Sequence, residues 1–240
     1  MFFKVFLFLL FFIKSSYAHE LRPAIANLNI YEKDNIINGN LSIRLNLEAI
    51  IAEIGMEHSN TEKSKESKEY ENLRNMSSFE LLERFNSKIQ SFQNKIYLRS
   101  SNSDYNLTLL SVNIPEVGNT NIVRDTIINF DIKNLKDEDL IFSWDKNLGS
   151  VILRVNSADN EALYSRLIET GKKSDWFSAT NKSEEGLIDN IKSYTRLGFK
   201  HIIPKGLDHI LFVLALFLLS SKLKPLILQV SIFTLAHTIT

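Results

Sequence analysis

The chain has 240 residues, with 28 basic side chains, 28 acidic side chains and no cysteine. A formal net charge of zero gives no long-range field to attract nucleic acid, so no nucleic-acid partner is expected. The lack of cysteine excludes disulfides, thiolate zinc sites and cysteine nucleophiles, which leaves histidine, aspartate and glutamate as the strong metal ligands.

Residues 1–18 have the pattern of a cleaved secretory signal peptide. A basic residue, Lys4, precedes an apolar run over residues 5–13, and the small residues Ser16 and Ala18 follow at the spacing of a cleavage site. The apolar run has about half of the roughly 20 residues that a membrane span needs. We therefore expect cleavage after Ala18 and export of the domain that follows.

Residues 19–185 are predicted to form a mainly β extracytoplasmic domain. Apolar and polar side chains alternate with a period of two, as in half-buried strands. Turn residues separate these segments, which favours an antiparallel, sandwich-like arrangement. The clearest alternating segments are residues 41–47, 105–114, 126–132 and 150–155.

One helix is predicted within this domain, over residues 77–92, with Ser78 as its N-cap. The apolar side chains at helical spacing are expected to lie in the core. They are Phe79, Leu82, Phe85, Ile89 and Phe92.

Two further features of this domain are interpreted as structural. Residues 58–74 carry mixed charges and few apolar side chains, so we expect a solvated loop or an exposed helical extension, with His58 at the surface. Trp144 and Trp176 lie in strand-like surroundings and are expected to be packing anchors.

Residues 186–240 are predicted to begin a polytopic helical membrane domain. Residues 198–219 would form about 33 Å of helix, against a hydrocarbon core of about 30 Å. A second apolar segment, residues 226–240, is cut short, so we expect the protein to continue beyond Thr240. The SSKLKP turn between them is expected on the cytoplasmic side.

Polar residues in these apolar segments point to a site. A charged group in a membrane interior costs about 2.5 to 3.5 kcal/mol and is expected to face protein, water or a metal. His201 and Asp208 fall within one arc of a helix, and His209 lies nearby. The second segment adds His237.

A carboxylate and three imidazoles suit nickel, cobalt or zinc better than calcium or magnesium. The sequence therefore predicts a divalent transition-metal site formed by His209, Asp208, His237 and His201. The same residues would also fit an Asp-His hydrogen-bonded pair that only joins two helices.

Three motifs resemble the HupE/UreJ family of hydrogenase- and urease-accessory membrane proteins. They are the G-x-D-H-I-L-F sequence of Gly206–Phe212, the F-T-x-A-H-T-x-T sequence of Phe233–Thr240, and AHELRP at Ala18–Pro23. The resemblance implies six or seven helices in the complete protein, a bacterial inner (cell) membrane location, and a role in nickel or cobalt uptake. The implied partners are the lipid bilayer and metalloenzyme maturation proteins.

The leading hypothesis is a protein that binds a divalent transition metal such as nickel and transports or delivers it for metalloenzyme assembly. This makes a transporter or accessory protein a better description than an enzyme. One alternative is a membrane-embedded metal-dependent hydrolase, in which Ser231 or Thr234 lies beside a metal-activated water. Another is a non-catalytic, membrane-anchored envelope protein whose β domain binds a partner.

Overall fold

The computed structural model describes residues 22–54, 65–120, 122–181, 207–219 and 227–232, and the single positions 195, 199 and 224. The predicted signal peptide, residues 1–18, lies outside these described residues. The chain divides into two compact units, Met1–Ser183 and Glu184–Thr240.

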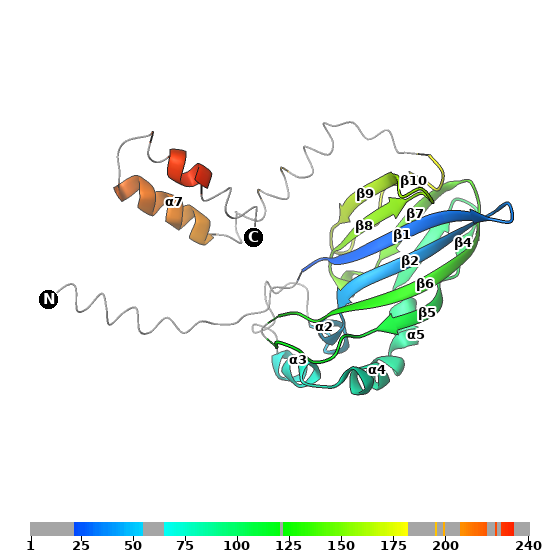
Figure 1. Cartoon of the computed structure of the whole chain (residues 1–240), viewed down its shortest axis with the longest axis horizontal. Helices are drawn as coiled ribbons and strands as arrows, with labels where there is room; N and C mark the ends of the chain where they lie inside the picture. The colour runs from blue at the N-terminus through cyan, green and yellow to red at the C-terminus, as the bar shows by residue number, and fades with distance from the viewer. Residues whose placement is uncertain are drawn as a thin grey trace. The chain divides into compact units, whose positions relative to one another are not determined.

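A six-stranded sheet dominates the first unit (Figure 1). Its neighbouring strands are antiparallel except for β1 and β8, which are parallel. In spatial order they are β5 (Thr108–Asn113), β6 (Asp125–Leu135), β2 (Ile36–Asn46), β1 (Ala24–Lys33), β8 (Val151–Asn156) and β9 (Ala162–Ile168).

The central hairpin of this sheet has a turn that suits its residues. Asp34 and Asn35, between β1 and β2, both have positive φ values, of 54° and 59°. Two consecutive left-handed residues match the right-handed twist of the flanking strands, and Asp and Asn tolerate this conformation better than most residues. The turn fixes the register in which Lys33 pairs with Ile36.

A four-stranded antiparallel sheet forms the second layer, in the order β10 (Phe177–Ser178), β7 (Asp139–Trp144), β3 (Ile96–Ser100) and β4 (Asp104–Tyr105). Side chains at alternating positions of both sheets join one buried core, including Leu28, Ile43, Phe130, Leu98 and Phe142. Burial of each such side chain contributes about 1.5 to 3 kcal/mol.

Among the residues that the structure describes between β2 and β3, four helices are present, where the sequence predicts one. They are α2 (Leu47–Ile51), α3 (Ser67–Arg74), α4 (Ser78–Asn86) and α5 (Ile89–Gln93), and a 3-10 turn, η2 (Lys146–Leu148), precedes β8. This unit is therefore a mixed, β-rich domain with two sheets and several short helices, and its largest sheet contains a parallel strand pair.

The predicted helix over residues 77–92 is interrupted, and its N-cap is Ser77 rather than Ser78. The Ser77 hydroxyl accepts from the Glu80 amide while the Glu80 carboxylate accepts from the Ser77 amide, a capping box that starts α4 one residue earlier. Phe85 and Phe92 are buried, but Phe79 is 67% exposed. Leu81 takes the buried position in place of Leu82.

Three further expectations about this unit have different outcomes. Ser67–Arg74 of the charged segment forms α3 and buries Tyr70 and Leu73, so this part is neither a solvated loop nor a fully exposed helix. Trp144 is a buried packing anchor, as predicted. The same prediction is wrong for Trp176, which is 53% exposed. His58 lies outside the described residues.

In the second unit, α7 covers Leu207–Leu219. Its 13 residues correspond to about 20 Å of helix, shorter than a hydrocarbon core of about 30 Å. Among the described residues, the structure contains no helix with the length and apolar character needed to cross a membrane. The prediction of α-helical transmembrane segments over residues 198–219 and 226–240 is therefore wrong for the described residues.

Candidate functional site

The predicted metal ligands fall partly within the described chain. Asp208 and His209 occupy consecutive positions near the start of α7. The backbone of both residues is described, but their side chains are not. His201 and His237 lie outside the described residues, as does Thr234. The four-residue metal site therefore stays a prediction.

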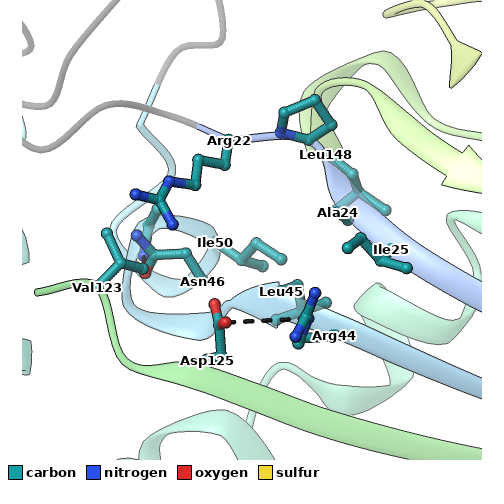
Figure 2. Close-up of a pocket in the computed structure, with 12 residues that line it drawn as sticks. Arg22, Ala24, Ile25, Arg44, Leu45, Asn46, Ile50, Val123, Asp125 and Leu148 are labelled. Carbon is teal, nitrogen blue, oxygen red and sulfur yellow. Dashed lines mark hydrogen bonds and ion pairs between the residues drawn. The ribbon is translucent and has the colours of Figure 1, made fainter. Parts of the chain in front are cut away.

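A pocket of about 100 Å³ lies at one end of the six-stranded sheet (Figure 2). The start of β1, the end of β2, α2 and the segment before β6 form its walls. Since one water occupies about 30 Å³ in the liquid, this volume suits a solute of a few heavy atoms. The pocket is lined by Arg22, Pro23, Ala24, Ile25, Arg44, Leu45, Asn46, Ala49, Ile50, Val123, Asp125 and Leu148.

The polar rim of the pocket is weakly cationic. It carries the guanidinium groups of Arg22 and Arg44 and the carboxylate of Asp125. Arg44 Nε lies 3.9 Å from Asp125 Oδ2, and both side chains are about half exposed, so this ion pair adds at most about 1 kcal/mol. None of the described lining residues is a serine, threonine, cysteine or histidine. The pocket therefore has the chemistry of a binding site for a small anion or polar solute.

Asn46 holds the helical wall of the pocket in place. Its Oδ1 accepts from the Ala49 amide at 3.1 Å, which caps α2. Its Nδ2 donates to the Tyr70 hydroxyl oxygen at 2.9 Å, which ties α2 to α3. Burial raises the pKa of the Tyr70 hydroxyl, because its charged form would be desolvated. This hydroxyl consequently stays protonated at neutral pH.

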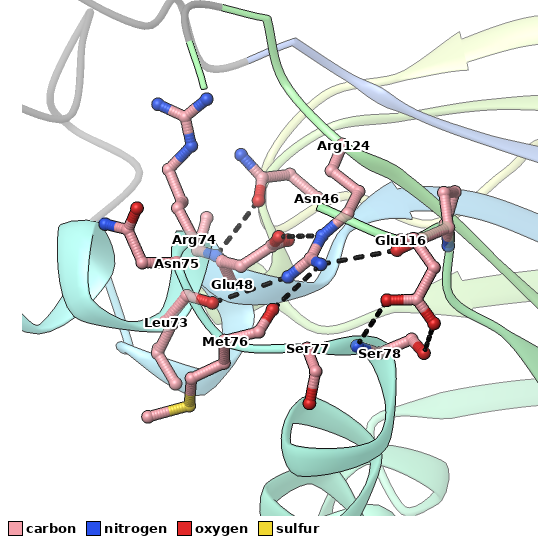
Figure 3. Close-up of polar contacts among 12 residues, drawn as sticks. Asn46, Glu48, Leu73, Arg74, Asn75, Met76, Ser77, Ser78, Glu116 and Arg124 are labelled. Carbon is pink, nitrogen blue, oxygen red and sulfur yellow. Dashed lines mark hydrogen bonds and ion pairs between the residues drawn. The ribbon is translucent and has the colours of Figure 1, made fainter. Parts of the chain in front are cut away.

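A buried ion pair joins α2 to the segment directly before β6 (Figure 3). Arg124 Nε donates to Glu48 Oε1 at 2.7 Å, and the two side chains are 9% and 1% exposed. The same guanidinium group donates to three backbone carbonyls, those of Met76 at 3.1 Å, Pro115 at 3.3 Å and Leu73 at 3.4 Å. One side chain thus joins α2, the end of α3, the α3–α4 connection and the segment after β5.

Sequence reasoning missed this pair, although one signal for it exists. Glu48 interrupts the apolar run from Leu47 to Ala52, where an acid is unexpected unless it has a buried partner. Arg124 lies 76 residues further along the chain, so sequence spacing could not identify it.

A carboxylate also binds the start of α4. The Ser78 amide donates to Glu116 Oε2 at 3.4 Å, and the Ser78 hydroxyl donates to Glu116 Oε1. These hydrogen bonds lower the pKa of the Glu116 carboxyl. Across the part of the chain that the structure describes, no group of three or more histidine, aspartate and glutamate side chains is placed to hold a metal ion.

The C-terminal part of the chain is similar to a known protein family. Residues 178–240 match the model of the HupE / UreJ protein family. This part of the chain is HupE/UreJ-like. The match confirms the resemblance predicted from the sequence motifs. The comparison with curated proteins gives no match for the chain.

The HupE/UreJ-like region contains all four predicted metal ligands, from His201 to His237. It begins at Ser178, within β10, and includes α7. The pocket and the Glu48–Arg124 pair lie in the β-rich unit, before the matched residues. The family match therefore supports the metal hypothesis and gives no information on the pocket.

Proposed function

We propose that this chain is a membrane-associated accessory protein that binds a divalent transition metal, such as nickel, and transports or delivers it for metalloenzyme assembly. The observation that carries the proposal is the HupE/UreJ match over residues 178–240, which includes Asp208, His209 and His237. Proteins of this family act in hydrogenase and urease maturation, and both of those enzymes depend on metal.

The residue types in this region suit the proposed cargo. Imidazole nitrogens bind nickel, cobalt and zinc well, whereas calcium and magnesium prefer oxygen ligands. Asp208 directly precedes His209, so a carboxylate is available either as a ligand or as an acceptor for an imidazole N–H. Of the four residues, His209 would be the principal ligand, with Asp208, His237 and His201 completing the set.

The proposed location is the bacterial inner membrane, with residues 19–185 on the extracytoplasmic side. Membrane association is typical of the HupE/UreJ family. In this proposal the metal arrives on the extracytoplasmic side, where the β-rich domain lies. Maturation proteins receive the metal on the cytoplasmic side. The lipid bilayer and these maturation proteins are the proposed partners.

Accumulation of radioactive nickel in cells that produce the complete protein tests the proposal. We expect His209→Ala and Asp208→Asn to reduce accumulation to the level of cells without the protein. His58→Ala is the matched control, because it removes a histidine outside the HupE/UreJ-like region and should leave accumulation unchanged. Equal accumulation by His209→Ala and the unaltered protein would refute the proposal.

The pH dependence of nickel retention gives a second readout. Imidazole binds metal only in its neutral form, and an ordinary histidine is protonated below a pH of about 6.5. We therefore expect purified protein to retain less nickel as the pH falls through this range. Retention that is constant from pH 8 to pH 5 would mean that imidazoles do not hold the ion.

A further inference from the structure

One face of the six-stranded sheet carries two polar rows, one across all six strands and the other across five of them. In Figure 1 this face is turned toward the viewer, with the four-stranded sheet behind it. The first row follows the strand register through Ser111, Asn129, Ser42, Asn27, Arg154 and Ser165. The second row follows the register through Thr108, Asp131, Asn40, Asn29 and Asn156, and the residue opposite Asn156 on β9 is the apolar Ala162.

These rows run against the ordinary preferences of β-strands. Asparagine is depleted in strands, where threonine or valine would stabilise the same positions better. Yet five asparagines occupy the two rows, on four adjacent strands. Repeated asparagines at strand positions of one surface, where they do not favour folding, indicate a function such as ligand binding.

Three of the five asparagine side chains take part in hydrogen bonds within the described sheet, and two do not. Asn129 Nδ2 donates to Ser111 Oγ at 2.9 Å, and Asn156 Nδ2 donates to Asn29 Oδ1 at 3.0 Å. Within the described residues, the side chains of Asn27 and Asn40 have no hydrogen-bond partner. Their donors and acceptors are therefore available to a ligand.

The charge of the two rows favours an uncharged partner. They contain one carboxylate, Asp131, and one guanidinium group, Arg154. Lys133 Nζ lies 3.7 Å from Asp131 Oδ2 and offsets the acid. The rows also lack the aromatic and apolar anchors that dominate binding energy in protein–protein interfaces. A neutral molecule that exchanges many hydrogen bonds fits this surface better than a protein does.

The spacing of the rows suits a polymer of hydroxyl-bearing rings. Neighbouring strands lie about 4.8 Å apart, so the first row presents a new polar side chain at this interval over about 24 Å, and the second row does so over about 19 Å. That interval is comparable with the length of one pyranose unit. Tyr31 continues the face of β1 beyond Asn27 and Asn29, and its ring is 37% exposed. An aromatic ring at this position can stack on the apolar face of a sugar.

We propose that the two polar rows form a binding surface for a neutral polysaccharide that lies across the strands. The amides of Asn27, Asn29 and Asn40 exchange hydrogen bonds with sugar hydroxyls, and Tyr31 stacks on one ring. This surface is independent of the proposed metal function, because it lies before the HupE/UreJ-like residues.

Binding of the purified full chain to polysaccharides of defined composition tests this inference. The probes are an insoluble β-linked glucan, a β-linked N-acetylglucosamine polymer, an α-linked glucan and an anionic uronic-acid polymer. We expect retention by at least one neutral polymer. The double variant Asn27→Val/Asn40→Val should weaken that retention about tenfold, since each lost hydrogen bond contributes about 0.5 to 1.5 kcal/mol.

Valine keeps the strands intact, because it has a higher strand preference than asparagine. Asn113→Val is the matched control, since Asn113 lies in β5, pairs with Ile127 and belongs to neither row. It should bind as the unaltered chain does. Equal binding by the double variant and the control would overturn the inference. Retention by the anionic polymer alone, or by none of the four polymers, would also overturn it.

Discussion

The buried pair of Glu48 and Arg124 should be the most costly polar interaction to remove from the β-rich domain. In Arg124→Met the Glu48 carboxylate, which is 1% exposed, loses its partner at 2.7 Å. Loss of one partner from a buried pair costs about 3 to 5 kcal/mol. The carbonyls of Leu73, Met76 and Pro115 also lose a charged donor. The expected loss in the free energy of unfolding is therefore about 4 kcal/mol or more.

Urea denaturation, followed by tryptophan fluorescence, measures this loss as a change in midpoint at constant m-value. Trp144 is a suitable probe because it is buried in the same domain. Arg44→Met is the matched control, since it removes an exposed pair at 3.9 Å and should cost less than about 1 kcal/mol. The double variant Glu48→Leu/Arg124→Met should lose less stability than Arg124→Met, because no unpaired charge stays buried. A loss in Arg124→Met no larger than in Arg44→Met would refute this account.

Three further predictions concern the same domain. Ser77→Ala should destabilise it by about 1 kcal/mol in urea denaturation, because it removes the side-chain cap of α4, and an unchanged midpoint would contradict this role. A hydrogen bond from Lys88 lowers the pKa of the Glu53 carboxyl, so the pair adds a small stability above the unfolded pKa that is lost as the pH falls through the folded pKa. Lys88→Met should therefore destabilise the domain at pH 7 more than at pH 2.5, by less than about 1 kcal/mol because the pair is exposed. Trp144→Ala should cost about 3 to 5 kcal/mol in thermal unfolding, whereas Trp176→Ala should change it little, and similar losses would contradict the observed burial.

The sequence predicts those features that depend on local periodicity. The alternating segment over residues 41–47 lies mostly in β2, and the segment over residues 126–132 lies within β6. Alternation identifies these strands because one face of each is buried. It does not identify their neighbours, since pairing joins distant parts of the chain. The parallel pairing of β1 with β8, more than 120 residues away, has no local signature.

The helical region between β2 and β3 was harder to predict for a related reason. The spacing from Phe79 to Phe92 predicts a single helix, but α4 ends at Asn86 and α5 begins at Ile89. Within α4, Leu81 and Phe85 face the core. Phe79 lies two positions before Leu81, about 200° around the helix, and is therefore exposed. In α3, two buried side chains, Tyr70 and Leu73, hold a mostly polar helix against α2. Tertiary contacts thus decide what composition alone leaves open.

Residues that break a local rule divide into two groups in this structure. Glu48 lies in an apolar run, and the fold itself explains it, because Arg124 neutralises the charge in the core. Asn27 and Asn40 lie in strand centres, and no described residue of the fold uses their amides. A domain that required only stability would favour β-branched residues at these two positions. Folding therefore explains the buried Glu48 but not Asn27 and Asn40. This difference supports a role for the two asparagine amides in binding a ligand.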